Sequence, residues 1–332
     1  MIGKGITFES EGTKLAGVLR TPDDMDGRSP GVLLVHGSLE QDRDGNLLEK
    51  RDGRPAFKKN FFIEISKNLC GAGFAAFSWD RRGIGESEGS WLDCDTMATI
   101  KDVKAALDCL CSQDDIDPDR IAVLGQSAGV YHACLLAGDL LAKGDPRPKV
   151  FVLQGGLCRN YSEMMAYNYR RLVDYAGRSP ENLRWIGEED LFGLMIGIHL
   201  SEIEERAKKG WTDHDLTYKG KTWRYHYDPM AYAEEYSPIR QFRHIKRPAL
   251  IIHGACDLNV PVEDASMILK ELKANGRDDM EYIIIPDADH SFQMVAGDED
   301  TRLRERITLD SFRRPYRREY FDALKGFLKR RL

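Results

Sequence analysis

The residues best suited to chemistry in this sequence surround a serine, Ser127, in the pentapeptide Gly125-Gln126-Ser127-Ala128-Gly129. The apolar run 120–124 before it predicts a strand, and the apolar stretch 130–142 after it predicts a helix. Gly-x-Ser-x-Gly between a strand and a helix is typical of a nucleophile elbow, in which the serine is strained and the glycines avoid clashes. The N–H of Ala128 would then lie at the helix N-terminus and stabilise an oxyanion. The predicted chemistry is nucleophilic attack on a carbonyl carbon, and the alternative is a turn whose serine merely caps the helix.

A serine hydroxyl needs a base to take its proton, and that base needs a carboxylate to hold it in one tautomer. The candidate base is His290, because it alone of the eight histidines lies in a loop after a late predicted strand. The candidate acid is Asp257, in the loop that follows the predicted strand 248–254. Asp287 and Asp289 are nearer to His290 in sequence, but we expect them to shape its turn instead.

A second oxyanion donor should come from the loop after the apolar run 31–37, which reads as a strand buried on both faces. We favour the N–H of Ser38, with Leu39 as the alternative. We expect His36, at the end of the same strand, to fix this loop with its ring and not to act as a base.

Strands alternate with helices over most of the chain, which predicts an α/β fold with a mostly parallel central sheet covered by helices on both faces. The alternation stops between residues 157 and 243, where the sequence reads as helical and is rich in Tyr, Trp and Met. We interpret 157–243 as an inserted helical cap and residues 1–156 and 244–332 as the core domain. The predicted strands are 2–9, 14–20, 31–37, 73–79, 120–124, 149–156, 248–254 and 280–285, and the predicted helices of the core are 57–70, 96–111, 130–142, 262–274 and 315–332.

The aromatic and methionine side chains of the cap allow two interpretations, a pocket for an apolar acyl group or the core of the cap itself. Charged residues of the cap, Glu202 among them, are expected to form a solvated helix face. The same expectation holds for the basic residues near the C-terminus, Arg306 among them.

Bulk properties limit the classes of partner. A formal charge of −6 over 332 residues gives no basic field for a nucleic acid. The N-terminus lacks the apolar core of a signal peptide, and no apolar run approaches the length of a membrane span. Seven scattered cysteines are interpreted as reduced thiols. We therefore expect a cytoplasmic protein with a small-molecule acyl substrate and no nucleic-acid or membrane partner, and we leave a homodimer open.

The chain resembles the α/β-hydrolase superfamily over nearly its whole length, and most closely its serine carboxylesterase, dienelactone-hydrolase-like and S33-peptidase-like branches. The order Ser127, Asp257, His290 is the order found in that fold. The matching motifs are His36-Gly37, Asp80-x-Arg82-Gly83-x-Gly85-x-Ser87, the elbow, His253-Gly254-x-x-Asp257-x-x-Val260-Pro261 and Asp289-His290. In this family the segment around Asp80 and Arg82 is usually architectural, so the resemblance places it outside the site. Leu39-Glu40 stands where a group of similar bacterial carboxylesterases has Gly-Pro.

The resemblance implies hydrolysis of a carboxylic ester through an acyl-enzyme intermediate, with no metal and no cofactor. The same three residues would also serve an acyl-CoA thioesterase, a peptidase or amidase, or a hydrolase of C–C bonds. A non-catalytic binding module built on this fold is the alternative from another class.

Overall fold

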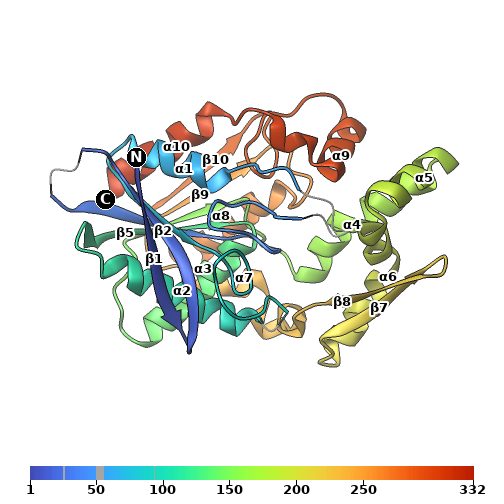
Figure 1. The fold of residues 1–332 in the computed structure, drawn as a ribbon, viewed down its shortest axis with the longest axis horizontal. Coiled ribbons are helices and arrows are strands. Elements are labelled where there is room, and N and C mark those ends of the chain that lie inside the picture. The colour runs from blue at the N-terminus through green and yellow to red at the C-terminus, as the bar shows by residue number, and fades with distance from the viewer. Residues whose placement is uncertain (25–26, 50–55, 93) are drawn as a thin grey trace.

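The computed structural model describes residues 1–24, 27–49, 56–92 and 94–332. Its main feature within these residues is an eight-stranded sheet with the order β1-β2-β4-β3-β5-β6-β9-β10 (Figure 1). β1, β2 and β4 pair antiparallel, and every other neighbouring pair in the sheet is parallel. The strands are β1 (Ile2–Ser10), β2 (Thr13–Thr21), β3 (Ser29–Val35), β4 (Ala75–Trp79), β5 (Ile116–Gln126), β6 (Val150–Gln154), β9 (Ala249–Gly254) and β10 (Met280–Ile285). The predicted mixed, mostly parallel sheet is confirmed.

Two layers of helices cover the two faces of this sheet. Consecutive residues of a strand point to opposite faces, and in β3 Val32 and Leu34 pack toward α1 and α10 while Leu33 and Val35 pack toward α2, α3 and α8. All four side chains are buried, which explains the unbroken apolar run in the sequence. The helices are α1 (Phe61–Cys70), α2 (Thr96–Cys111), α3 (Ala128–Ala142), α8 (Glu263–Ala274) and α10 (Arg318–Arg331).

Residues 157–243, called the insertion below, leave the sheet after β6 and return to it before β9 (Figure 1). Side-chain caps define where its helices begin, since Asn160, Ser179 and Asp190 each accept a hydrogen bond from a backbone N–H three residues later. Its elements are α4 (Tyr161–Gly177), α5 (Pro180–Glu189), α6 (Leu191–Lys208), β7 (Asp213–Tyr218), β8 (Lys221–His226), η1 (Pro229–Tyr232), η2 (Glu234–Tyr236), α7 (Pro238–Gln241) and η3 (Phe242–His244). The last residue of η3, His244, lies just outside the insertion.

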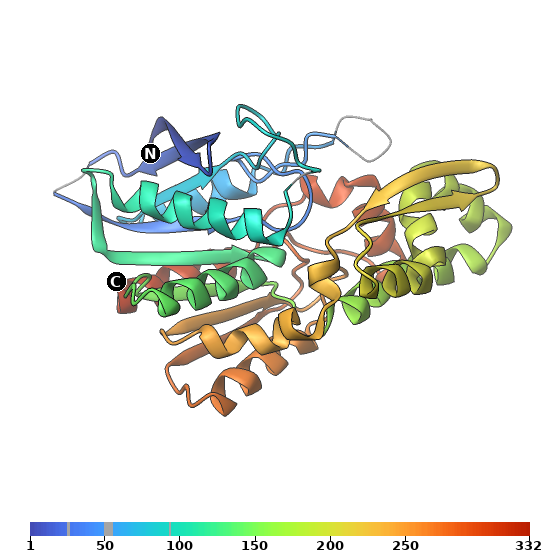
Figure 2. The ribbon, with the colours of Figure 1, turned by 90° about the horizontal axis from the view of Figure 1, so that it is seen from below.

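The insertion is not wholly helical, and on this point the sequence-based prediction is wrong. β7 and β8 form a two-stranded antiparallel hairpin that projects beside α6 (Figure 2). In β7, His214 and Leu216 are buried whereas their neighbours Asp215 and Thr217 are exposed, which is the alternation of a half-buried strand. The turn uses Lys219-Gly220, both with positive φ, a pattern typical of a tight hairpin.

Two short elements follow β10, α9 (Glu299–Thr308) and η4 (Asp310–Arg313), and the sequence analysis did not predict them. α9 lies beside α4 and α5 although more than a hundred residues separate them in the sequence (Figure 1). Leu303 and Ile307 of α9 share an apolar cluster with Leu172 and Ile186 of the insertion. Through α9, the C-terminal part of the core contacts the insertion directly. Among the described residues, no helix combines the length and the apolar character that a membrane crossing requires.

Candidate active site

Ser127 lies in a sharp turn between the end of β5 and the start of α3. Its backbone angles are φ 55° and ψ −121°, a conformation that L-residues rarely adopt. Its N–H donates to the carbonyl of Gln154 at 2.9 Å, and this bond ties the turn to the end of β6. Ala128 is the first residue of α3, so its N–H has no partner within the helix and is available to an anion.

The glycines on either side of Ser127 are required by close backbone contacts. A Cβ on Gly125 would lie 2.5 Å from the carbonyl oxygen of Gly129, and a Cβ on Gly129 would lie 2.4 Å from the carbonyl oxygen of Val35. Both contacts are to backbone, which no side-chain rotation can relieve. The steric role expected for these glycines is therefore confirmed.

The loops after β9 and β10 bring Asp257 and His290 together. His290 donates through Nδ1 to Asp257 Oδ2 at 2.6 Å. The other carboxylate oxygen, Oδ1, accepts the backbone N–H groups of Asn259 at 2.7 Å and Val260 at 2.9 Å. Because an ionised carboxylate only accepts hydrogen bonds, Nδ1 of His290 carries a proton and Nε2 is left as an acceptor.

A second histidine, His253 in β9, also contacts this carboxylate, with Nε2 at 3.1 Å from Asp257 Oδ2. Burial alone would raise the pKa of Asp257, but His290 and His253 together hold that pKa below its usual range. Burial would likewise lower the pKa of His253, and its bond to Asp257 outweighs this and raises the pKa. The sequence analysis missed His253 because a histidine inside a buried strand looks like a core residue.

Ser127 and His290 each contact the end of β6. The N–H of Ser127 is bonded to Gln154, and the imidazole of His290 lies over the next residue, Gly155, with Cε1 3.2 Å from where a Cβ would stand. Ser127 and His290 are both partly exposed, whereas Asp257 is buried. Within the described part of the chain, the structure records no hydrogen bond from the Ser127 hydroxyl to the imidazole. Such bonds are often long before substrate binds.

The loop predicted to supply the second oxyanion donor is held by its carbonyl groups. Arg81 Nη1 donates to the carbonyl of Gly37 at 2.8 Å, and Gln41 Nε2 donates to the carbonyl of Ser38 at 3.0 Å. In a trans peptide the N–H points opposite to the carbonyl, so these two bonds direct the N–H groups of Ser38 and Leu39 away from Arg81 and Gln41. Leu39 has a φ of 75°, which turns the chain sharply.

Arg81 belongs to the segment that the sequence analysis placed outside the site, yet it contacts the oxyanion loop. The signal in the sequence was its position two residues after β4, at the edge where the parallel strand β3 also ends. Its buried guanidinium also lowers the pKa of His36, which burial has already lowered, to about 3. A histidine with so low a pKa is a weak base, which agrees with the structural role expected for His36.

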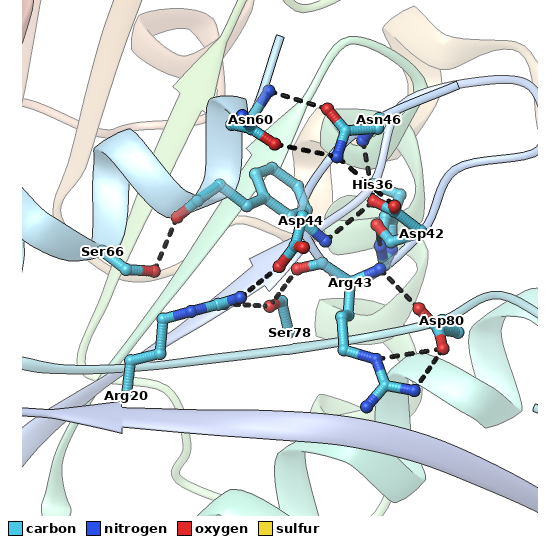
Figure 3. Close-up of polar contacts among 11 residues, drawn as sticks. Arg20, His36, Asp42, Arg43, Asp44, Asn46, Asn60, Ser66, Ser78 and Asp80 are labelled. Atoms are coloured by element: carbon cyan, nitrogen blue, oxygen red, sulfur yellow. Dashed lines mark hydrogen bonds and ion pairs between the residues drawn. The ribbon is translucent and has the colours of Figure 1, made fainter. Parts of the chain in front are cut away.

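A polar network fixes the continuation of this loop (Figure 3). His36 Nε2 is 3.2 Å from the carbonyl of Asp42, which agrees with the predicted role of its ring. Asp42 Oδ1 accepts the N–H of Asn46 at 2.9 Å, and Arg43 Nε donates to Asp80 Oδ2 at 3.0 Å. These bonds anchor the loop to β4, so the path of the oxyanion loop is defined at both ends.

The insertion contacts the loop that carries Asp257. Tyr167 of α4 donates its hydroxyl to the carbonyl of Asp257 at 2.9 Å. Arg306 of α9 donates through Nη1 to Asn168 Oδ1 at 2.7 Å and to the carbonyl of Leu258 at 2.8 Å. Arg306 was predicted to lie on a solvated face, and that prediction is wrong because its guanidinium bridges α4 and the Asp257 loop.

The aromatic and methionine side chains of the insertion were open to two interpretations. Met165, Met195 and Tyr227 are buried in an apolar cluster built entirely from the insertion, so these three form its own core. The described residues that could jointly hold a metal ion, His199, Glu202 and His214, also lie in the insertion.

Comparisons with known proteins agree with this architecture. The family model described as "Serine aminopeptidase, S33" matches residues 58–294. Non-reducing polyketide synthase AdrD of Penicillium roqueforti is 25% identical over 345 residues, which cover 92% of this chain and 13% of the synthase. The chain thus spans about an eighth of that relative.

Two solved structures share the fold. The Pyrococcus furiosus esterase Pf2001 has a TM-score of 0.56 at 17% identity, covering 99% of this chain and 91% of the esterase. The esterase domain of a Rhodothermus marinus protein has a TM-score of 0.52 at 19% identity, covering 95% of this chain and 99% of the domain.

Proposed function

The chain belongs to the serine aminopeptidase S33 family of hydrolases with the α/β-hydrolase fold, and from this premise we propose that it hydrolyses a carboxylic ester through an acyl-enzyme intermediate on Ser127. The observation that carries the proposal is the 2.6 Å bond between Asp257 and His290 beside the strained Ser127 turn. Supporting contacts are those of the Ser127 backbone and the His290 ring with adjacent residues at the end of β6.

The proposed reaction begins when Ser127 Oγ attacks the carbonyl carbon while Nε2 of His290 accepts the hydroxyl proton. The buried Asp257 holds the imidazole and stabilises the imidazolium. The negative oxygen of the tetrahedral intermediate accepts hydrogen bonds from the N–H groups of Ala128 and Ser38, each contributing about 3 kcal/mol. Leu39 is the alternative second donor.

The intermediate collapses when His290 returns the proton to the leaving alkoxide, which departs as an alcohol. Water then attacks the acyl-enzyme, again giving its proton to His290, and the acid product is released as Ser127 regains its proton. No step requires a metal or a cofactor.

We further propose that the insertion acts as a cap that selects the acyl group. Support comes from its position, since Tyr167 of α4 bonds to the backbone of Asp257 itself. Hydrolysis rates on p-nitrophenyl esters of increasing acyl length test this proposal, and a preference for acetate over every longer ester would contradict a large apolar acyl site.

A fluorophosphonate probe tests the nucleophile directly. The wild-type chain should be labelled on Ser127, as read by mass spectrometry of the labelled peptide, and Ser127→Ala should lose both the label and ester hydrolysis. Ser291→Ala is a matched control because Ser291 is adjacent to His290 but binds Lys59 instead. Labelling of Ser127→Ala at the wild-type rate, or a label on Ser291, would show that the assignment is wrong.

The description of the matching family favours one second candidate, hydrolysis of an amide or peptide bond. The proposed residues would act in the same way, with an amine as the leaving group. Matched p-nitrophenyl esters and p-nitroanilides of the same acyl group separate the two, and acyl-CoA thioesters can be included in the same panel. A kcat/KM for the anilide that equals or exceeds that for the ester would favour the peptidase.

A further inference from the structure

Three side chains of the insertion converge on one another far along the chain from Ser127 and His290. His199 and Glu202 lie on α6, and His214 lies on β7. Residues three apart on a helix lie on the same face, and β7 runs alongside that face with His214 turned toward it. The three are joined as His199 Nδ1 to Glu202 Oε2 at 2.8 Å, His214 Nε2 to Glu202 Oε2 at 3.0 Å and His214 Nε2 to His199 Nδ1 at 3.5 Å.

Both ring nitrogens of His199 have a close oxygen partner. Its other ring nitrogen, Nε2, is 3.1 Å from the carbonyl of Thr217, which can only accept a hydrogen bond, so Nε2 carries the proton. In the neutral imidazole, Nδ1 then directs a lone pair at a carboxylate oxygen 2.8 Å away. Two acceptors at this distance need a proton or a cation between them.

We propose that His199, Glu202 and His214 form a binding site for a divalent transition-metal ion of the zinc type. Two imidazole nitrogens and one carboxylate oxygen are a typical ligand set for Zn²⁺ with a fourth position left for water. A backbone carbonyl that accepts the far N–H of a ligating histidine is the usual second-shell partner, and Thr217 supplies it here.

The distances fit an ion without movement of the ligand atoms. A triangle with the three sides 2.8, 3.0 and 3.5 Å has a circumradius of about 1.8 Å. Since zinc bonds to nitrogen and oxygen are about 2.0–2.2 Å long, a point at bonding distance from all three atoms exists about 1 Å off their plane. A regular tetrahedron with bonds of this length places the metal about 0.7 Å above its base, so two of the three sides, 2.8 and 3.0 Å, are shorter than in a regular site.

The surroundings also suit a metal site that keeps one position open. The side chains of His199 and His214 are 15% and 8% exposed, whereas Glu202 is 61% exposed and leaves room for water. The sequence analysis assigned Glu202 to a solvated face; it is exposed, but both histidines contact its carboxylate. A bound ion would fasten the β7–β8 hairpin to α6, and this role is independent of the proposed hydrolysis.

Zinc binding by the 332-residue chain tests the proposal. After treatment with a chelator and desalting, the protein is titrated with Zn²⁺ in competition with a chromophoric chelator, and we expect one ion per chain. Glu202→Gln and His214→Ala should each weaken binding by about tenfold or more. His226→Ala, an exposed histidine in the same hairpin, is the matched control and should bind as the wild type does.

Two further measurements distinguish zinc bound at this site from zinc bound elsewhere on the chain. Co²⁺ in place of Zn²⁺ should give no sulfur-to-cobalt charge-transfer band, which distinguishes this site from metal bound by Cys109 and Cys111. Zn²⁺ should also raise the melting temperature of the wild type more than that of Glu202→Gln at the same Zn²⁺ concentration, since the exposed side chain at 202 lets the variant fold. Absence of binding at micromolar Zn²⁺, or equal loss in His226→Ala, would overturn the proposal and leave a histidine–carboxylate ion pair.

Discussion

Replacing Gly129 by alanine should disturb the turn around Ser127 more than any other single methyl group at the elbow. The added Cβ would lie 2.4 Å from the carbonyl oxygen of Val35 and 2.6 Å from that of His36. Ordinary contacts of a Cβ begin near 3.4 Å. The first turn of α3 and the end of β3 must therefore separate by roughly 1 Å, because neither side offers a side chain that could rotate away.

This separation gives the expected magnitudes. Overpacking of a filled interior costs about 1–3 kcal/mol of the free energy of unfolding. His36 is followed by the oxyanion loop, and Gly129 follows Ser127 by two residues, so the nucleophile and its oxyanion donor move relative to each other. Misplacement of reacting groups by about 1 Å can reduce the rate by about a hundredfold.

Two measurements on purified protein test this reasoning, urea unfolding followed by tryptophan fluorescence and the rate of labelling by a fluorophosphonate. Gly129→Ala should unfold at lower urea and label about a hundredfold more slowly. Gly187→Ala is the control, because Gly187 lies within α5 and a Cβ there would meet no heavy atom within 4 Å. That variant should gain about 0.5–1 kcal/mol and label at the wild-type rate.

The reasoning is refuted if Gly129→Ala unfolds at the wild-type urea concentration and labels at the wild-type rate. That outcome would mean that the backbone of β3 does not lie against the start of α3. A variant that loses stability and still labels normally would separate the two effects, and would show that the hydroxyl is placed independently of this contact.

Three further predictions concern the surroundings of the site. Arg306→Met should lose about 2 kcal/mol of the free energy of unfolding because it leaves partly buried acceptors unpaired. Loss of an exposed ion pair in Arg178→Ala should cost less than about 1 kcal/mol, and equal urea midpoints would contradict this. Burial raises the pKa of Asp289 to about 6. The folded state therefore binds more protons than the unfolded state between about pH 4 and 6, so the free energy of unfolding falls as pH rises through that interval. Urea unfolding of the wild type at pH 4.5 and 7.5 should show this fall, and in Asp289→Asn the fall should be smaller by about 1–3 kcal/mol. Identical pH profiles for the two proteins would count against this prediction. His253→Phe removes one of the two imidazoles that contact Asp257. We expect about a tenfold lower kcat, an unchanged KM and an acid limb of the pH profile of kcat/KM that moves to higher pH. A pH profile that superimposes on that of the wild type would exclude a positioning role for His253.

Elements with a regular apolar pattern were predictable from the sequence. Residues 96–111 and 280–285 form the predicted helix and strand with the predicted bounds, because in each the apolar pattern ends where the element ends. The hairpin of β7 and β8 was missed because it is half exposed, so its weak alternation competes with the helical reading of its surroundings. α9 was missed because Leu303 and Ile307 alone anchor an otherwise polar helix.

Some residues of the candidate site were likewise predictable from the sequence and others were not. The positions of Asp257 and His290 after β9 and β10 followed from the pattern of strands, since carboxyl ends of parallel strands share one edge. Arg81, His253 and Arg306 could not be found in this way. Arg81 and Arg306 act through contacts with segments more than forty residues away, and His253 reaches Asp257 only because the loop after β9 turns back on the strand; the spacing of residues does not record these contacts.

The bonds from α4 and α9 to the Asp257 loop have a consequence for engineering. The phenol of Tyr167 and the amide of Asn168 come from the insertion, and the guanidinium of Arg306 comes from a helix more than a hundred residues later. A chimera that received a foreign segment in place of residues 157–243 would lose two of these three groups and retain the third without its counterpart. Recombination between relatives should therefore transplant α4 and α9 as a matched pair if the graft is to keep the carboxylate in place.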